Sequence, residues 1–372
     1  MKIIDACLLF GSFHSCSDLL YREEKGMKTL IVEKDGALHI GEIPVPEIDE
    51  TSALVKVLAS GICGTDKKIL HGTFKGFDSY PCLLGHEAVG EVVKIGSKVK
   101  YLKVGDKVIT PYVDKGPGKY TTIFGAFSEY TVVHDWKAMD ELGIGRGTPG
   151  FVDYYQIQKK IPSNFDNASG VMLITLREVL AATRHFDFKA DKSIVIFGAG
   201  AVGLSFAKIA KIIGMSPVIL TDVLPEKAED AEKVGADFFV DSSKEDIVST
   251  VRRICPEGVN YVLDAVGVNS IINTAMKLIS SCGRILVYGI SPKLGMDLNW
   301  GEAPYNWSLQ FFQYPEKEEE AAAHEQMVSW IEQKIIDPNA FISHTFSFNH
   351  ILEAFDLFMS GKPTKKIVIT YD

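Results

Sequence analysis

A cysteine, a histidine and a glutamate in the first quarter of the chain are of the types that bind Zn²⁺. Cys63 is followed by Gly64, and His86-Glu87 follows Gly85. A thiolate, an imidazole and a carboxylate make a three-ligand set that leaves one position for water or substrate, and the thiolate offsets metal charge. Taken singly, Cys63 reads as a buried core thiol and His86 as a satisfied core histidine. Their joint spacing between glycines is what predicts a metal site.

A second run of residues has the spacing of a dinucleotide-binding loop. Residues 198–203 read Gly-Ala-Gly-Ala-Val-Gly, directly after the apolar run 193–197 and before a helix-length stretch. Gly198 permits the tight turn, Gly200 lets the backbone approach a pyrophosphate, and Gly203 allows close helix–strand contact. The residues expected at the cofactor are Gly198, Gly200, Ala201, Val202, Gly203 and Asp222.

Asp222 bears on the choice of cofactor. It ends the next apolar run, 22 residues beyond Gly200. A carboxylate there can accept hydrogen bonds from both ribose hydroxyls and repels a 2′-phosphate, so the pattern favours NAD over NADP. The alternative is a glycine-rich turn in an unrelated α/β domain, and the order of strand, loop, helix and acid argues against it.

The elements that must position these side chains follow two patterns. From Met27 to about residue 133 the chain is β-rich, with apolar runs between Gly, Pro and Asp turns. From about residue 166, amphipathic helix-length stretches alternate with short apolar strands, which predicts a doubly wound parallel sheet. We expect strands at 53–58, 88–93, 107–109, 193–197, 217–220, 237–240, 261–263, 284–288 and 366–370, and helices at 204–213, 316–334 and 352–359.

Composition bounds the class of protein. The 372 residues suggest about two domains, and 46% hydrophobic with 23% charged residues is typical of a globular chain. A net charge of −9 without a basic tract argues against nucleic-acid binding and against binding an anionic membrane surface. Six scattered cysteines and no apolar run of membrane-spanning length favour a reduced, cytoplasmic protein.

Residues 1–26 form a possible non-native or disordered extension. Asp5 breaks the apolar run that could imitate a secretory signal, and no small-residue cleavage site follows. Met27 opens what reads as a normal first strand pair, and purine-rich codons for residues 22–26 would resemble a ribosome-binding site. Two interpretations stay open, a true start at Met27 and a genuine disordered tail.

Gly85-His86-Glu87-Ala88-Val89-Gly90, followed at fixed spacing by Gly96 and Val99, resembles the signature of zinc-containing medium-chain alcohol dehydrogenases. The order of regions is also similar to theirs. The resemblance covers about residues 27–372 and is greatest for sorbitol, threonine and polyol dehydrogenases. It implies an α/β protein with a GroES-like β-rich catalytic domain over 27–173 and 314–372 and an NAD-binding Rossmann domain over 174–313.

The resemblance places one catalytic zinc on Cys63, His86 and Glu87. The structural zinc of many relatives is not expected, because residues 100–135 contain no cysteine. Ile174 stands where relatives have a fourth ligand. Water must then fill that position, unless Glu178, one helical turn later, reaches in.

The implied reaction is reversible oxidation of a secondary alcohol, a polyol or a sugar-derived alcohol, with hydride transfer to NAD. The Thr65 hydroxyl takes the proton and passes it on through the cofactor ribose or water. Lys68 stands where relatives often have a relaying histidine, and it needs a depressed pKa for that role. His71 is expected at the surface, and Asp66 either orients its neighbours or is a helix N-terminal carboxylate.

Three aromatic residues and one apolar run bear on the substrate pocket and the oligomeric state. Trp136, Phe151 and Tyr154 either wall the pocket or pack in an interface or core. By resemblance we expect a homodimer or homotetramer, with residues 284–290 as a plausible edge of the parallel sheet.

The rival class is a zinc-free, quinone-reductase-like enone reductase that uses NADPH. The three zinc-type side chains and Asp222 speak against it, and a non-enzymatic scaffold protein would not need them.

Overall fold

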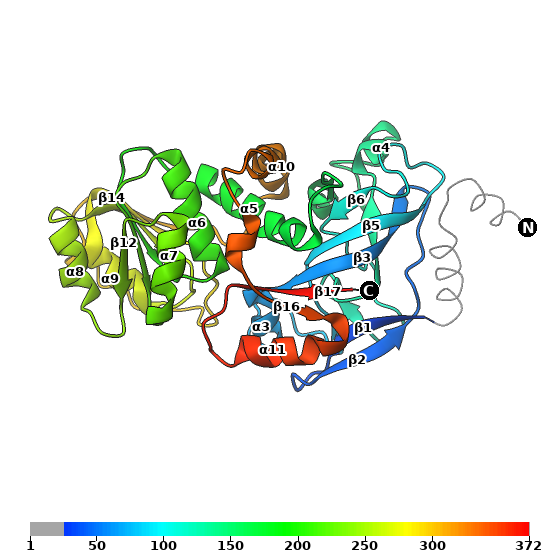
Figure 1. The fold of residues 1–372 in the computed structure, drawn as a ribbon, viewed down its shortest axis with the longest axis horizontal. Coiled ribbons are helices and arrows are strands. Elements are labelled where there is room, and N and C mark those ends of the chain that lie inside the picture. Colours follow the sequence, from blue (N-terminus) through cyan, green and yellow to red (C-terminus); the bar gives the residue numbers. More distant parts are fainter. Residues whose placement is uncertain (1–25, 372) are drawn as a thin grey trace, which may run out of the picture.

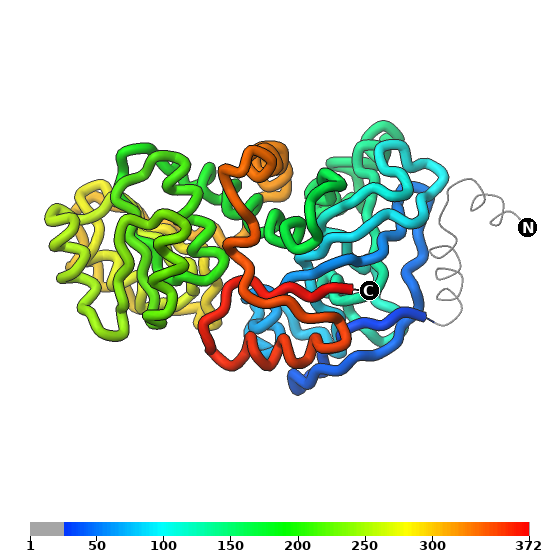
Figure 2. The backbone as a smooth tube through the Cα atoms, viewed as in Figure 1, coloured from blue at the N-terminus to red at the C-terminus, as the bar shows by residue number. Residues whose placement is uncertain are grey.

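The computed structural model describes residues 26–371, and the expectation about a start at Met27 concerns residues outside that part. Two bodies lie side by side along the long axis (Figure 1). One contains the β-rich N-terminal part and the C-terminal end, and the other contains the middle of the chain. The tube trace shows that the chain crosses between them and returns (Figure 2). The predicted α/β class with a GroES-like part and a Rossmann-like sheet is confirmed.

The β-rich body contains two sheets. A seven-stranded sheet has the order β16-β17-β3-β5-β6-β9, with β8 paired to β3, and a four-stranded sheet has the order β2-β1-β4-β7. Their bounds are β1 Met27–Val32, β2 Leu38–Ile43, β3 Ser52–Ile62, β4 Cys82–Leu83, β5 Glu87–Ile95, β6 Lys107–Ile109, β7 Thr121–Thr122, β8 Tyr130–His134, β9 Lys159–Lys160, β16 Ile342–Ser347 and β17 Lys366–Thr370.

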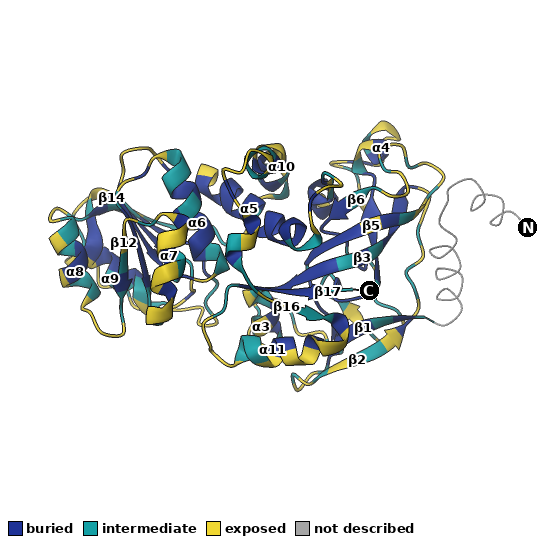
Figure 3. Cartoon of the chain, in the orientation of Figure 1, coloured by how far each residue is buried: buried dark blue, intermediate teal, exposed yellow. Residues whose placement is uncertain are grey.

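Strand β17 completes the larger sheet from the far end of the chain. It pairs antiparallel with β3, so that Ile367 lies opposite Ile62, and parallel with β16. On its other side β3 pairs antiparallel with β5, with Gly61 opposite Glu87. Nearly every residue of β3 is buried, because α5 packs over this part of the sheet (Figure 3).

The second body is a six-stranded parallel sheet of order β12-β11-β10-β13-β14-β15. The order reverses at β10, which is how a doubly wound sheet creates a crevice for ligands at the carboxyl ends of its strands. The bounds are β10 Ile194–Phe197, β11 Val218–Asp222, β12 Phe238–Asp241, β13 Val259–Asp264, β14 Ile279–Val287 and β15 Trp307–Phe311.

Helices of two kinds surround the sheets. The α-helices are α3 Gly64–Leu70, α4 Trp136–Glu141, α5 Asn167–His185, α6 Ala201–Ile213, α7 Ala228–Val234, α8 Ile247–Ile254, α9 Ser270–Leu278, α10 Lys317–Glu332 and α11 Ile351–Met359. The short 3₁₀ turns are η1 Asp153–Ile157, η2 Pro225–Lys227, η3 Trp300–Glu302, η4 Pro338–Phe341 and η5 Phe348–His350. Within the part of the chain that the structure describes, none of them is both long and apolar enough to cross a membrane.

One expectation about the parallel sheet is wrong. Residues 284–290 do not form its edge, because β15 (Trp307–Phe311) lies outside β14. The sequence of β15, Trp-Ser-Leu-Gln-Phe, mixes polar and apolar residues and follows an irregular stretch instead of a crossover helix. The alternation of strands and helices therefore gave no sign of it.

Helix α5 connects the two bodies. The Asp166 side chain caps its start by accepting the N–H of Ser169 at 2.8 Å. Helix α10 packs along it, and the buried Arg177 guanidinium of α5 contacts the Glu320 carboxylate of α10 at 2.5 Å. Since α5 runs continuously past residue 173, the domain boundaries at 173/174 and 313/314 stay a prediction.

Candidate metal and cofactor site

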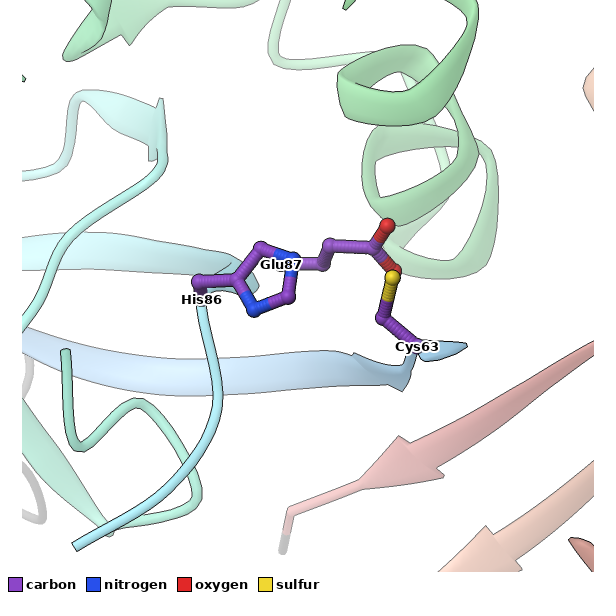
Figure 4. Close-up of side chains that lie close together, drawn as sticks. All are labelled: Cys63, His86 and Glu87. Atoms are coloured by element: carbon purple, nitrogen blue, oxygen red, sulfur yellow. The ribbon is translucent and has the colours of Figure 1, made fainter. Parts of the chain in front are cut away.

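The three side chains predicted as metal ligands lie together (Figure 4). Cys63 directly follows β3, and His86-Glu87 stands at the start of the neighbouring strand β5. Their sulfur, nitrogen and oxygen atoms all lie within 4.8 Å of one another. Among residues 26–371, they form the one group of three such side chains that converges in this way.

The charges in this group suit a divalent cation. Burial works to lower the pKa of His86, but hydrogen bonding to Cys63 and the charges of Cys63, Asp66 and Glu87 outweigh it and raise the pKa to about 10. The anionic groups around the His86 imidazole thus favour its protonated form. A bound metal ion would neutralise the same negative charges instead. The donor set and its convergence fit zinc.

Glu87 is held on both of its oxygens. Oε1 accepts a hydrogen bond from the Thr175 hydroxyl of α5 at 2.9 Å, and Oε2 accepts one from the Lys366 ammonium of β17. Lys366 is 3% exposed. Burial works to lower the pKa of Lys366, and the Glu87 charge outweighs it and raises the pKa. Gly61 makes room, since a Cβ there would lie 2.6 Å from Glu87 Oε2.

Sequence reasoning missed Lys366 and Thr175. The available signal was weak: Lys366 opens an apolar strand, where a charged residue needs a partner.

The Asp66 side chain contacts Cys63, one of the three predicted metal ligands. Its Oδ2 accepts the backbone N–H of Cys63 at 2.8 Å, at the first turn of α3. Asp66 is fully buried, and this burial raises the pKa of its carboxyl to about 6. Both interpretations of Asp66 therefore describe one contact, because a first-turn carboxylate here also orients Cys63.

The predicted proton-transfer residues occupy different surroundings. Thr65 and Lys68, both on α3, line a cavity that is also lined by Cys63, His86 and Glu87, which we call the metal-type group. Thr65 is hydrogen-bonded to the Tyr314 hydroxyl, a partner that the sequence did not indicate. Burial lowers the pKa of Lys68, in the direction that a relay would need. His71 is exposed, as expected.

A cavity of about 440 Å³ joins the two bodies at this site. Ile174 and Glu178 line it, and so does Tyr154, but Trp136 and Phe151 do not. Phe151 packs edge-on against Tyr155, with 5.5 Å between ring centroids, and Trp136 lies against lysine and arginine side chains. Of the three aromatic residues considered for the pocket wall, Tyr154 therefore lines this cavity and Trp136 and Phe151 pack elsewhere.

The glycine-rich loop has the geometry that each glycine was expected to provide. Gly198 has φ +97°, a conformation that favours glycine. A Cβ on Gly203 would lie 1.7 Å from the Gly198 carbonyl oxygen, whereas one on Gly200 would meet nothing within 4 Å. The loop thus combines a tight turn, close helix–strand packing and open space in front of the N-terminus of α6.

Asp222 ends β11 beside this loop. Its Oδ2 accepts the N–H of Ala199 at 2.7 Å and its Oδ1 accepts the N–H of Leu224 at 3.0 Å. The carboxylate is therefore fixed in orientation, with the remaining lone pairs of its oxygens available to a ligand.

The cavity also reaches the carboxyl ends of the parallel strands. Val202 of the glycine-rich loop and Ala265, just after β13, line the same space as the metal-type group. A cofactor at the loop and an ion at the group would therefore share one cavity.

Two family models match the chain. A model described as an alcohol dehydrogenase GroES-like domain matches residues 49–141, which include the metal-type group. A model described as a zinc-binding dehydrogenase matches residues 201–314, within the parallel-sheet body.

Individual relatives match almost the full length. The chain is 28% identical to a sorbitol dehydrogenase of Bombyx mori over 89% of this chain and 95% of the relative. It is 28% identical to an L-threonine 3-dehydrogenase of Alteromonas mediterranea over 92% and 99%. A solved structure of the RspB alcohol dehydrogenase of Escherichia coli CFT073, complexed with NADH, superposes with a TM-score of 0.74 at 24% identity, covering 92% of this chain and 99% of that one.

Proposed function

The chain belongs to the zinc-type medium-chain alcohol dehydrogenase family, and on that premise we propose that it oxidises a secondary alcohol reversibly to the ketone with NAD. Its relatives make it an oxidoreductase of the alcohol dehydrogenase type. The substrate we propose is a polyol or a sugar-derived alcohol. The zinc-free enone reductase is not favoured.

The observation that carries the proposal is the single cavity shared by two sites. The thiolate, imidazole and carboxylate lie at one side of it, and Val202 of the glycine-rich loop lies at the other. Hydride transfer requires the carbinol carbon and the nicotinamide in van der Waals contact, which a shared, largely apolar cavity provides.

Cys63, His86 and Glu87 would hold the zinc ion. When bound, zinc supplies Lewis acidity toward the substrate oxygen, and the nicotinamide supplies the hydride acceptor. Lys366 and Thr175 hold the Glu87 carboxylate, and Asp66 holds the Cys63 backbone. These residues keep the ligand atoms in position before any substrate arrives.

Thr65 is the proposed proton acceptor. Its hydroxyl lies in the first turn of α3, lines the cavity and is hydrogen-bonded to Tyr314. Lys68, one turn further along α3 and also at the cavity, is the proposed exit toward solvent.

The preference for NAD rests on Asp222. Its carboxylate is fixed by two backbone N–H groups at the end of β11, where an adenosine ribose binds in this kind of sheet. A 2′-phosphate would face that negative charge.

The functions of the two parts of the chain and the oligomeric state are also proposals. We assign catalysis to residues 27–173 and 314–372 and NAD binding to 174–313, with α5 as the shared connector. For a homodimer or homotetramer, the outer strands β12 and β15 are the edges of the parallel sheet, and β15 is the one beside the predicted residues 284–290.

The direct experiment is NAD⁺ reduction, followed by nicotinamide absorbance, with purified zinc-loaded protein and a panel of secondary alcohols that includes polyols. We expect oxidation of at least one of them with NAD⁺, and loss of activity after chelation that added zinc restores. Reduction of an enone with NADPH, with no alcohol oxidised, would reject the proposal.

A further inference from the structure

Glu178 is a charged residue at the cavity that the proposed reaction does not use. It lies in α5, one helical turn after Ile174. From Val171 to Thr183 every residue of this helix is buried except Glu178, which is partly exposed. Since Glu178 lines the cavity, this exposure is exposure to the cavity, where a substrate would lie.

Glu178 is not placed as a metal ligand. The ligand atoms that converge within 4.8 Å are those of Cys63, His86 and Glu87, and Glu178 is not in that group. Its side chain is instead hydrogen-bonded to the Tyr288 hydroxyl, at the end of β14. It thus stands beyond the metal-type group, on the wall of the cavity.

Unlike the neighbouring Glu320, Glu178 has hydrogen-bond acceptor positions that a ligand could use. Glu320 beside it is already held on both oxygens, by Arg177 at 2.5 Å and by Lys317 at 2.9 Å. Glu178 has no salt bridge of this kind to any residue between 26 and 371. A carboxylate has about four acceptor positions, and one phenol fills one of them.

Lys317 lies at the same end of the cavity. Its side chain is about a quarter exposed, and its ammonium group donates to Glu320 and lies 5.6 Å from the centroid of the Tyr154 ring. An ammonium carries three donors. The polar end of the cavity therefore offers an acceptor, Glu178, beside a donor, Lys317, while Phe74, Ile123 and Phe124 form an apolar wall.

We propose that Glu178 is a specificity-determining residue: its carboxylate accepts a hydrogen bond from a donor group on a carbon beside the reacting carbinol. The donor is a hydroxyl or an ammonium group, and Lys317 donates to an oxygen further along the same molecule. The inference rests on the proposed function and narrows it to alcohols with a neighbouring donor group, at the expense of simple secondary alcohols.

The physical reason is the cost of leaving the Glu178 carboxylate without hydrogen-bond partners once a bound substrate has displaced its water. A monofunctional alcohol would displace water from Glu178 without replacing its hydrogen bonds, and a site built to bind a donor rejects an analogue that lacks it. Binding of an alcohol with a neighbouring donor group is thus favoured, and binding of an alcohol without one is disfavoured.

The test compares three substrates. Butane-2,3-diol and butan-2-ol differ only in the hydroxyl beside the reacting carbinol, and L-threonine carries an ammonium group at that carbon and a carboxylate in place of the terminal methyl group. Each is assayed with NAD⁺ and zinc-loaded enzyme, as wild type and as the variants Glu178→Gln and Glu178→Leu. We expect the wild type to prefer the diol or threonine over butan-2-ol in kcat/KM. Glu178→Leu should lower that preference by about 10- to 100-fold, in part by raising the activity on butan-2-ol, which in this variant displaces no water from a carboxylate.

Glu178→Gln distinguishes the two kinds of donor. An amide oxygen still accepts a hydrogen bond from a hydroxyl but offers no charge to an ammonium, so this variant should keep more of a diol preference than of a threonine preference. Glu325→Gln, an exposed glutamate on α10, is the control and should leave all three rates unchanged. Zinc content and circular dichroism of each variant show whether metal and fold are retained.

Three results would overturn the inference. The wild type could prefer butan-2-ol, the preference could survive in Glu178→Leu, or all three rates could fall together with the zinc content. In the first two cases the alcohol dehydrogenase function stands and only the role of Glu178 fails. If the wild type oxidises neither these three alcohols nor any polyol of the wider panel, the proposed function fails and the inference fails with it.

Discussion

The glycine-rich loop and the metal-type group stand on two walls of one cavity, but they are assembled in opposite ways. The loop site uses backbone geometry and one carboxylate, all within residues 198–222. The metal-type group draws on side chains at the end of β3 and the start of β5 and on partners from α5 and β17, which are far apart in the sequence.

This difference shows what each site depends on. The loop is determined by local conformation, so that Gly198 and Gly203 suffice to shape it. The metal-type group depends on long-range contacts, because Glu87 is oriented by Thr175 and Lys366 from elements far away in the sequence. Variants of the second site should therefore disturb stability and metal binding together, and removing the Asp222 charge at the first site should change cofactor choice with the fold retained.

The largest effect should come from the ligand set itself. His86→Ala and Cys63→Ser each remove one of three zinc ligands, and we expect kcat/KM to fall by roughly 10³-fold or more, since a Lewis acid contributes several kcal/mol. Zinc content by elemental analysis should fall in parallel. The exposed Cys282→Ser is the matched control, and a zinc-free variant with full activity would contradict the assignment.

Next in size is the buried ion pair. Lys366→Met leaves the Glu87 carboxylate buried without its cation, which should lower the free energy of unfolding by about 3–5 kcal/mol in zinc-free protein. Urea denaturation measures it, and zinc should restore part of the loss by neutralising Glu87. The exposed Lys362→Met tests whether any nearby lysine has this effect. Equal stability of the two variants would mean that the pair does not support the site.

At the loop site we expect a change in preference without a loss of fold. Asp222→Ser removes the negative charge that would face a 2′-phosphate, and the ratio of kcat/KM for NADP⁺ to that for NAD⁺ should rise by roughly 100-fold. The melting temperature should change little. Asp241, opposite Asp222 on the neighbouring strand β12, provides the control Asp241→Ser. If this kcat/KM ratio does not change in Asp222→Ser, residues other than Asp222 determine the choice of cofactor.

The smallest effect concerns His324 in helix α10, which packs against α5. Burial, helped by the nearby Arg177 charge, lowers the pKa of His324 from 6.5 to about 3. The folded state thus binds this proton more weakly than the unfolded state. Stability is complete above pH 6.5 and is lost as the pH falls toward 3.

In His324→Gln this loss should be absent. Between pH 7 and pH 5 the wild type should lose about 2 kcal/mol more unfolding free energy than the variant, measured by urea denaturation at each pH. Parallel pH profiles would show that His324 is already protonated in the fold.

The same contrast explains how much the sequence could predict. Strands 107–109 and 366–370 were placed to the residue, because short apolar runs between turn residues are local signals. The roles of the glycines and the convergence of Cys63 with His86 were also accessible, since each depends on a motif.

The partners of those residues were not accessible from single positions. Lys366, Thr175 and Tyr314 become meaningful only when distant segments meet, and no spacing along the chain encodes that. Strand β15 was missed for a related reason, because its mixed sequence is stabilised by pairing with β14 and not by its own pattern.

The pairing of β17 with β3 has a consequence for biosynthesis. Ile367 is made about 300 residues after Ile62, its partner in the sheet, which at roughly 5–20 residues per second is a delay on the order of 15–60 s. Until then one edge of β3 has no strand beside it, and Glu87 has no ammonium. The nascent chain therefore has an open sheet edge that invites aggregation or a chaperone, and the metal site is completed only after Lys366 has been made.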